Sequence, residues 1–510
     1  MKRSRCSFAA LAFAVAVTAA ATARADVKLP AIFGDNMVLQ ADAKVPVWGK
    51  AEPGERIEVR VGIDTAATPD APNAPNAAPT DAVTQAKQTT ADDKGQWKVV
   101  LDPLPASDEP IGFVITGKNK VTLENVLVGE VWVASGQSNM EWPVRASNDP
   151  EKEIAEAKFP TIRLFQVQKK VAADAPAEDV VGQWVVCGPE TVGNFSAVAY
   201  FFGREIQNAT SRPVGLIGTY WGGTPAESWT SREKLESDEA LKPLVTNWDA
   251  LDKREQEAGE NKSRQSPHHP AGLYNGMLAP IVPFAIRGAI WYQGESNAGR
   301  AYQYRTLFPA MITDWRERWG QGDFPFLFVQ LANFMQRKDQ PADSAWAELR
   351  EAQSLTLDLP NTGQAVIIDI GDVADIHPKN KQDVGKRLAL SALAVAYEKE
   401  DVVSSGPVFK DVTFEDGKAV LSFDHVGGGL EAKGDALKGF AIAGEDRVFK
   451  WADATIEGDT IVVSSPEVKN PTAVRYAWAD NPEATLYNAE DLPASPFRTD
   501  EWPGVTDDKQ

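Results

Sequence analysis

The middle of the chain, from about residue 125 to residue 399, alternates between continuous apolar runs and segments with a helical spacing of apolar residues. The runs that fit buried strands are Val126 to Ala134, Val214 to Tyr220, Gly288 to Tyr292, Phe324 to Gln330 and Gln364 to Ile370, and the helical segments include Ala197 to Asn208 and Asp383 to Tyr397. Such alternation predicts an α/β domain over residues 125–400, with helices on both faces of a parallel sheet. In these sheets, ligands bind beyond the carboxyl ends of the strands.

The segments on either side of this domain have a different pattern, with short apolar or alternating runs separated by turn residues. This pattern predicts a small β-sandwich over residues 26–124 and a second β-rich module over residues 401–510. Within the first module, residues 64–93 are rich in Ala, Pro, Asn, Thr and Asp and have little to bury. We therefore expect residues 64–93 to form a flexible, low-complexity excursion.

The first 25 residues have the features of a secretory signal peptide. Three basic residues precede an apolar run from Phe8 to Ala21, and small residues offer a cleavage site before Asp26. The apolar run is shorter than the roughly 20 residues of a membrane span, and no later stretch qualifies. We expect residues 1–25 to be removed and the protein to be exported to a periplasm or the cell exterior, without membrane insertion.

Charge and cysteine content exclude several classes of protein. The chain carries 52 basic and 72 acidic side chains, a formal net charge of −20, which repels phosphate backbones and argues against a nucleic-acid partner. Its two cysteines are Cys6 and Cys187, so loss of Cys6 with the signal peptide leaves no internal disulfide. Cys187 has no electropositive neighbour in sequence and is expected to be a buried packing residue rather than a nucleophile.

Glycine-containing turns follow the first two strand-like runs. The first run leads into Ser135 to Met140, a turn from strand to helix of the kind that projects a serine hydroxyl into the crevice. Ser138 is therefore a candidate nucleophile, although a helix N-cap is the simpler role for such a serine. The second run leads to Gly222 and Gly223, whose N–H groups can face an incoming oxygen atom.

Polar side chains follow two further runs. One is followed by Gln293 and Asn297, either of which can offer an amide to an oxyanion, and the last is followed by Asp372, Asp375 and His377. A single loop histidine is usually a surface residue. Here, however, a serine, a glycine turn, two amides and an imidazole fall at one edge of the sheet. The combination outweighs the simpler role of each residue and favours a functional site at this edge of the sheet.

These motifs resemble the sequence blocks of the sialate O-acetylesterases, a family of SGNH hydrolases. The matching blocks are Gly136 to Met140, Gly222 to Thr224, Trp291 to Asn297 and Ile376 to Pro378, with further similarity at Phe33 to Gln40 and Leu492 to Thr499. The resemblance covers nearly all of the chain after the signal peptide. It implies a flavodoxin-like sheet and hydrolysis of O-acetyl esters of carbohydrates through an acetyl-serine, without a metal or organic cofactor.

The resemblance also implies roles for the residues. Ser138 would attack the ester, and His377 would be its base. The oxyanion would be held by the N–H groups of Ser138 and of Gly222 or Gly223, together with the amide of Gln293 or Asn297.

The third member of the triad stays open. Many SGNH enzymes have an aspartate three residues before the histidine, and this chain has Ala374 at that position. Asp372, Asp375 or a main-chain carbonyl can orient the imidazole. We favour Asp372, because it lies nearer to the end of the predicted strand.

Aromatic residues gather around the motifs, and flat aromatic faces pack well on the C–H surfaces of sugar rings. We expect substrate contacts from Trp221, Trp291 and Tyr292. A sialic acid would also need a cation for its carboxylate, and Arg145 is the nearest candidate in sequence. The predicted partner is an acetylated sugar, either a sialic acid or a plant-type glycan.

Three alternatives remain open. Glu295 with Asp372 or Asp375 could be the acid and base of a glycosidase, but this would leave the serine and histidine motifs without a role. His268 and His269 could hold a metal ion. Two β-rich modules with many tryptophans also fit a noncatalytic carbohydrate-binding protein.

Overall fold

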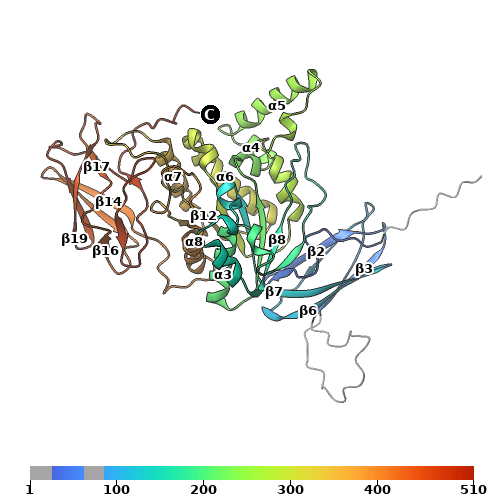
Figure 1. Ribbon diagram of the computed structural model, residues 1–510. Helices are drawn as coiled ribbons and strands as arrows, with labels where there is room; N and C mark the ends of the chain where they lie inside the picture. The colour runs from blue at the N-terminus through green and yellow to red at the C-terminus, as the bar shows by residue number, and fades with distance from the viewer. Residues whose placement is uncertain (1–25, 63–84, 510) are drawn as a thin grey trace, which may run out of the picture.

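The computed structural model describes residues 26–62 and 85–509. The expected signal peptide over residues 1–25, including Cys6, and residues 64–84 of the expected excursion lie outside the described residues. Three parts follow one another along the chain: an N-terminal β-module, a central sheet covered by helices, and a C-terminal β-module at the opposite end of the molecule (Figure 1). The predicted fold class, α/β with flanking β-rich modules, is confirmed.

The N-terminal module consists of short strands, several of which bury every second residue. Its strands are β1 (Val38–Gln40), β2 (Val45–Lys50), β3 (Arg56–Gly62), β4 (Gln85–Thr90), β5 (Gln96–Leu101) and β6 (Ser107–Thr116). β2 pairs with β5, and β3 pairs with both β4 and β6. Because side chains alternate between the two faces of a strand, each strand contributes one face to the core.

β4 lies within the residues expected to form an excursion, and it corrects that expectation for its own length. It pairs with β3 from Gln85 opposite Val61 to Thr90 opposite Arg56. None of its residues is buried, and five of its six side chains are polar (sequence QAKQTT), so the period of apolar residues cannot reveal it. Main-chain hydrogen bonds at a sheet edge hold this strand, where polar residues are favoured.

β7 (Lys120–Gly136) is a single strand of 17 residues that belongs to two parts of the molecule. Its first half pairs with β6 and β1, and its second half pairs in parallel with β10 (Val214–Tyr220) and β11 (Gly288–Tyr292). Every residue from Val126 onward is buried. The expected boundary between residues 124 and 125 therefore falls inside one continuous strand.

The central sheet has the strand order β13-β12-β11-β7-β10-β8-β9. Its other strands are β8 (Phe159–Gln166), β9 (Trp184–Cys187), β12 (Phe326–Val329) and β13 (Thr362–Ala365). All neighbours are parallel except β8 and β9. Without that edge pair, the order is the flavodoxin-like 2-1-3-4-5. The chain leaves β7 first toward one side and later toward the other, which opens a crevice beyond the carboxyl end of β7.

Helices cover both faces of this sheet (Figure 1). They are α1 (Ser138–Glu141), α2 (Pro150–Glu156), α3 (Ala197–Thr210), α4 (Arg232–Ser237), α5 (Lys242–Glu257), α6 (Ala301–Trp319), α7 (Ala345–Leu355) and α8 (Lys381–Val395). On one face, Trp132 of β7 meets Phe202 of α3 edge-on at 5.0 Å, and α8 packs on α3. On the other face, Trp291 of β11 contacts Phe308 and Trp315 of α6.

β13 is shorter than predicted. The apolar run from Gln364 to Ile370 suggests a longer strand, but the strand ends at Ala365. Arg387 of α8 donates to the Val366 carbonyl at 2.9 Å and pairs with both oxygens of Asp369 at 2.6 and 2.8 Å. These contacts satisfy the main chain outside the sheet, so the apolar residues are buried in a loop instead.

The C-terminal module has its own apolar core. Its strands are β14 (Val408–Glu415), β15 (Lys418–Asp424), β16 (Leu430–Ala432), β17 (Phe440–Ala443), β18 (Lys450–Trp451), β19 (Asp453–Glu457), β20 (Thr460–Ser464), β21 (Ala473–Tyr476), β22 (Leu486–Asn488) and β23 (Phe497–Arg498). They form sheets in the orders β14-β15-β20-β19 and β18-β17-β21-β23, with β16 paired to β22.

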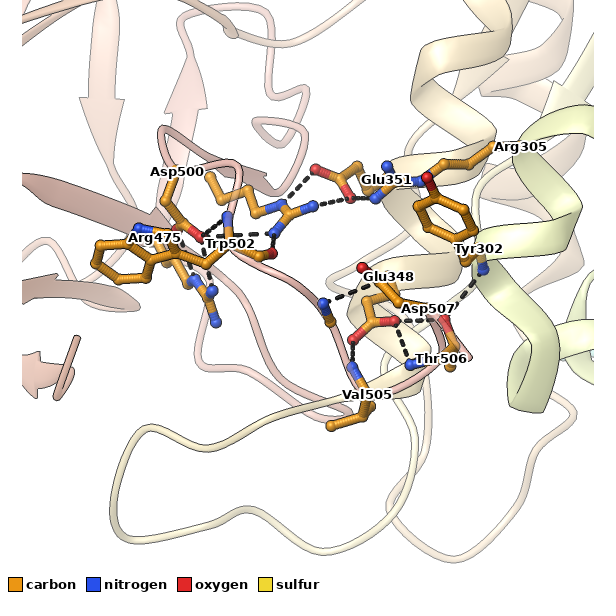
Figure 2. Close-up of polar contacts among 12 residues, drawn as sticks. Tyr302, Arg305, Glu348, Glu351, Arg475, Asp500, Trp502, Val505, Thr506 and Asp507 are labelled. Carbon is orange, nitrogen blue, oxygen red and sulfur yellow. Dashed lines mark hydrogen bonds and ion pairs between the residues drawn. The ribbon is translucent and has the colours of Figure 1, made fainter. Parts of the chain in front are cut away.

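Hydrogen bonds tie the last residues of the chain to α7 (Figure 2). Arg498 donates to Glu351 at 2.7 Å, and the N–H groups of Val505 and Thr506 donate to Glu348 at 2.7 and 3.0 Å. Hydrogen bonds to ionised groups are stronger than neutral ones. They hold the C-terminal module against the helices of the central domain.

Cys187 ends β9 and is buried, and its burial raises the pKa of the thiol to about 12. This is the environment of a packing residue, because a reactive cysteine needs a lowered pKa. In the part of the chain that the structure describes, no helix has the length and apolar character needed to cross a membrane.

Candidate active site

The turn after β7 presents Ser138. Gly136, the last residue of β7, has a φ of 138°, and a Cβ atom there would lie 2.2 Å from the carbonyl oxygen of Tyr292. Only glycine allows this approach. The Gln137 N–H donates to the same carbonyl at 3.0 Å. Ser138 then begins α1, with its side chain half-buried at the carboxyl end of β7.

The imidazole of His377 lies against the Ser138 hydroxyl. His377 Nε2 is 2.9 Å from Ser138 Oγ, and His377 Nδ1 is 3.1 Å from Asp375 Oδ1. The main-chain N–H of His377 donates to the same Asp375 oxygen at 2.9 Å, and this bond, together with that from the ring, lowers the pKa of Asp375. The indole of Trp142 is stacked on the imidazole at 4.9 Å. This row of serine, imidazole and carboxylate has the arrangement that activates the nucleophile in serine hydrolases.

The structure corrects the preference for Asp372 as the partner of the imidazole. Asp372 Oδ1 accepts the N–H groups of Ala374 and Asp375 at 2.7 and 3.2 Å, and so it closes the loop rather than reaching the ring. Asp375 lies two residues before His377, which lets one carboxylate oxygen accept from both the main chain and the ring of that histidine.

Asn139 links the serine turn to the histidine loop. Its Nδ2 donates to the Ile376 carbonyl at 3.0 Å and to Glu295 Oε1 at 2.6 Å, and its Oδ1 accepts from Lys381 Nζ at 2.5 Å. Asn139 directly follows the serine, and Ile376 directly precedes the histidine. One buried amide therefore sets the distance between the two segments, and its orientation is fixed by a cation on one side and a carboxyl on the other.

Lys381 and Glu295 complete a buried network beneath the site. Burial lowers the pKa of Lys381 to about 7 and raises the pKa of Glu295. The Lys381 ammonium also lies 5.1 Å from the ring centre of Tyr292. The Glu295 carboxyl faces Asn139, and its Oε2 is buried without a hydrogen-bond partner among the described residues. A glycosidase acid or base must instead reach the sugar, so this position does not suit that alternative.

Glu141 reaches the glycine turn after β10. Its Oε2 accepts the Gly222 N–H at 2.6 Å, and its Oε1 accepts from Lys169 Nζ at 2.6 Å. A Cβ atom on Gly222 would lie 3.3 Å from Ser138 Cβ, so the turn passes beside the serine. Gly223 is exposed with a φ of 77°, and its N–H makes no hydrogen bond within the described residues. Of the two glycines, Gly223 thus has the N–H that is not already engaged.

The structure also corrects the prediction of Gln293 and Asn297 as oxyanion donors. Both side chains are buried. Gln293 Nε2 donates to Asn297 Oδ1 at 2.6 Å and to the Thr224 carbonyl at 3.3 Å, while Asn297 Nδ2 donates to Glu227 Oε2 at 3.0 Å. Their amide groups are used to hold the loop after β10, because an amide buried here must find internal partners.

Trp291 and Tyr292 are core residues, which corrects their assignment to substrate binding. Both are 0% exposed. Successive residues of a strand point to opposite faces, so Trp291 lies under α6 and Tyr292 lies against Lys381 of α8. Trp221 is only partly buried, and the Lys169 ammonium lies 5.3 Å from the centre of its ring.

An open cleft of about 780 Å³ lies above the serine and the histidine. The residues that line it include Ser138, His377, Trp142, Arg145, Lys169 and Asn194. Arg145 is exposed on the wall of this cleft and forms no ion pair with any described residue. Lys169, in contrast, is already paired with Glu141.

Within the described ranges, no three His, Cys, Asp or Glu side chains come together to hold a metal ion. His269 is buried, with its ring nitrogens 3.1 Å from Asp252 Oδ2 and 2.9 Å from the Pro270 carbonyl oxygen. His268 is exposed. The adjacent histidines therefore have different surroundings and do not provide the ligand set that the metal-hydrolase alternative needs.

The sequence motifs predict no role for Asn139, Glu141, Lys169 or Lys381. For the first two a signal exists, since they follow the serine within one turn. Lys381 stands at the start of a helix that is otherwise apolar on one face, and a buried lysine requires a polar partner. Lys169 has no sequence signal, because only the folded chain brings it to Glu141.

The chain is similar to known carbohydrate esterases in both sequence and structure. Residues 128–394 match a family model described as carbohydrate esterase, sialic acid-specific acetylesterase. The sialate O-acetylesterase of Homo sapiens is 30% identical over 517 residues, which cover 92% of this chain and 92% of the human protein. That of Mus musculus is 30% identical over 90% of this chain and 92% of its own. The crystal structure of a carbohydrate acetylesterase from Xanthomonas citri is 41% identical, with a TM-score of 0.80 over 93% of this chain and 100% of that chain.

Asp375→Asn should lower kcat for 4-nitrophenyl acetate by about 10- to 100-fold, because an amide favours the wrong imidazole tautomer and cannot stabilise the imidazolium. The Asp375 side chain is 42% exposed, so the loss should be smaller than for a buried carboxylate. Asp372→Asn is the matched control, since an asparagine oxygen still accepts the loop N–H groups, and its kcat should stay within about twofold. Equal losses in steady-state kinetics of the two variants would contradict the assignment of Asp375.

Asn139→Ala should lower kcat by about 10- to 100-fold with little change in KM, because the serine and histidine segments lose the amide that sets their separation. Asn194→Ala is the control, since Asn194 is exposed and lines the same cleft without joining the two segments. Thermal unfolding shows whether both variants are folded. A raised KM with an unchanged kcat would instead indicate that Asn139 acts in substrate binding.

Proposed function

The chain belongs to the family of sialic acid-specific acetylesterases among the carbohydrate esterases, and on this premise we propose that Ser138 and His377 carry out its reaction, the removal of O-acetyl groups from carbohydrates. The observation that carries the assignment is the 2.9 Å separation of Ser138 Oγ and His377 Nε2 on the wall of an open cleft. This is the distance at which a neutral imidazole takes the hydroxyl proton.

The proposed reaction has two halves. Ser138 Oγ attacks the acetyl carbonyl carbon while His377 Nε2 takes its proton, and the tetrahedral intermediate collapses as the sugar oxygen leaves with that proton. Water then attacks the acetyl-serine and gives a proton to the same nitrogen. His377 returns that proton to the serine oxygen as acetic acid leaves, and the acid then loses its own proton to water as acetate. Asp375, whose pKa is lowered by hydrogen bonds from the main chain and ring of His377, holds the ring through Nδ1 and stabilises the charged form of the imidazole.

The negative oxygen of the tetrahedral intermediate needs hydrogen-bond donors. Ser138 lies at the start of α1, where the first N–H groups of a helix have no partner within the helix. We assign the second donor to Gly223, because the N–H of Gly222 is donated to Glu141. Loss of one such donor typically costs about 3–4 kcal/mol of transition-state stabilisation.

The proposed substrate is an acetylated sugar that carries a carboxylate, as sialic acid does. The human and mouse relatives are sialate O-acetylesterases, and Arg145 offers a guanidinium on the cleft wall that pairs with no carboxylate of the described residues. The net charge of −20 opposes the approach of an anion, so a local cation matters more in this chain than in a neutral one. An acetylated plant-type glycan is the second candidate, since the relative from Xanthomonas citri is described only as a carbohydrate acetylesterase.

We also propose that the protein is exported. The support is the basic, apolar and small-residue pattern of residues 1–25, which lie outside the described residues. Acetylated glycans of other cells would then be within reach.

Ser138→Ala should reduce hydrolysis of 4-nitrophenyl acetate to the background rate, because no other hydroxyl replaces the nucleophile. Mass spectrometry of the wild type treated with a serine-directed fluorophosphonate should show one adduct, on the peptide that contains Ser138. Normal turnover in the variant would end the assignment of this serine.

Arg145→Ala should raise KM for an O-acetylated sialoside by about tenfold and leave KM for acetylated xylo-oligosaccharides within about twofold, because only the sialoside has a carboxylate to pair with the guanidinium. Product analysis by chromatography on both substrates gives the two constants. An equal change for both substrates would count against a carboxylate-bearing substrate. It would leave the esterase assignment in place.

A further inference from the structure

A second cavity, of about 270 Å³, lies between the C-terminal module and the loop that precedes α7. The module contributes Arg447, Phe449, Trp451, Arg475 and Trp478, and the loop contributes Asp343. None of these residues lines the cleft above Ser138. The volume is close to the lower end of the roughly 300–1,000 Å³ of ligand sites, which suits one sugar-sized ring. We call this cavity the Trp451 pocket.

Trp451 presents a fixed and exposed indole to the pocket. Trp451 is 41% exposed and is the only tryptophan among the large exposed apolar residues of the described chain. The indole Nε1 donates to the Asp339 carbonyl at 2.8 Å, which holds the ring in place. Val448, 50% exposed, also lines the pocket. Large apolar surface that a fold keeps exposed and rigid at a cavity is typical of a binding site.

The base of the pocket is preorganised by Arg475. Its guanidinium lies between the rings of Phe449 and Trp478, at 4.2 and 5.2 Å from their centres. Its nitrogens also donate to both oxygens of Asp500 at 2.9 and 2.8 Å (Figure 2). The Asp500 carboxylate accepts from the Trp502 N–H as well. The charge of Arg475 is therefore balanced, and its position is fixed before any ligand arrives.

Two further charged groups at the pocket form no ion pair with any described residue. The Arg447 side chain is exposed, with its guanidinium 5.3 Å from the ring centre of Trp502 and in no ion pair with a described residue. Asp343 is exposed, and its carboxylate makes no hydrogen bond within the described part of the chain. A strong donor and a strong acceptor thus stand at the edge of an aromatic surface.

We propose that the Trp451 pocket binds a pyranose ring of a glycan. One C–H face of such a ring packs on the indole, and the hydroxyl groups at its edge donate to Asp343 and accept from Arg447. A purely apolar ligand would leave both charges without partners. A phosphate would be repelled by Asp343 and would make no use of the indole. The assignment does not depend on the roles of Ser138 and His377.

The loop between β12 and α7 contacts both the loop that carries His377 and the Trp451 pocket. Near its start, Asn333 Oδ1 accepts the Gly371 N–H at 2.7 Å, and Phe334 pairs with Asp372 of the loop that carries the histidine. Near its end, residues 341–343 form a wall of the Trp451 pocket. A glycan chain held there would stay attached to the enzyme and raise the local concentration of its acetyl groups.

Calorimetric titration of the full chain tests the proposal. The parent is Ser138→Ala, which prevents turnover, and the probes are 3′-sialyllactose and xylohexaose. Trp451→Ala in this parent should weaken binding of at least one glycan by about tenfold or more, while Trp451→Phe, which keeps a flat ring, should stay within about threefold. A loss for sialyllactose alone identifies an acidic glycan as the ligand, and a loss for xylohexaose identifies a neutral one.

Phe414→Ala is the matched control, because Phe414 is an exposed aromatic residue of β14 in the same module and does not line the pocket. It should bind both glycans as the parent does. With Ser138 intact, Trp451→Ala should hydrolyse 4-nitrophenyl acetate at the wild-type rate, which separates this site from the esterase site. Undetectable binding of both glycans by the parent, equal affinity of the parent and Trp451→Ala, or equal loss in Phe414→Ala would overturn the proposal.

Discussion

A side chain at Gly136 would meet the carbonyl of Tyr292 at 2.2 Å, and this lack of room decides how β7 can end. The chain must therefore turn beside β11 with a positive φ at Gly136, a conformation that residues other than glycine rarely adopt. Ser138 and Asn139 then follow side by side, one facing the cleft and the other facing the interior. Asn139 donates to the carbonyl of Ile376, directly before His377, so buried groups beneath the cleft set the separation of Ser138 and His377.

The parts of the site that sequence could predict are those fixed by topology. Carboxyl ends of parallel strands meet at one edge, so a serine after the first strand and a histidine after the last are expected to meet. The parts it could not predict depend on which way a side chain turns. Gln293 is the first residue after β11 and Ser138 is the second after β7, yet the side-chain amide of Gln293 donates to Asn297 and Thr224. Sequence distance likewise cannot separate an aspartate that closes a loop from one that contacts the ring.

The fold likewise has parts that the sequence could predict and parts that it could not. β10 and β11 are buried at every position and match the predicted ranges residue for residue, because strands buried on both faces have nearly continuous apolar sequences. The apolar pattern does not predict β4, because main-chain hydrogen bonds at a sheet edge hold this strand without buried side chains. The predicted strand extends beyond the observed end of β13, because Arg387 gives the Val366 carbonyl a hydrogen-bond partner outside the sheet. Apolar sequence records burial, and it does not record which group completes each main-chain hydrogen bond.

The passage of β7 through both the N-terminal module and the central sheet also limits how this protein can be divided. Modules joined by a linker can swivel, be exchanged or be cut apart, since few contacts cross the join. Here one ladder of hydrogen bonds continues across it. Rotation of one part against the other would break these hydrogen bonds. A protein shortened to the central domain would begin with an unpaired strand edge, and such edges promote association with other copies. The N-terminal module and the central domain should therefore be kept together in any shortened or recombined version of the protein.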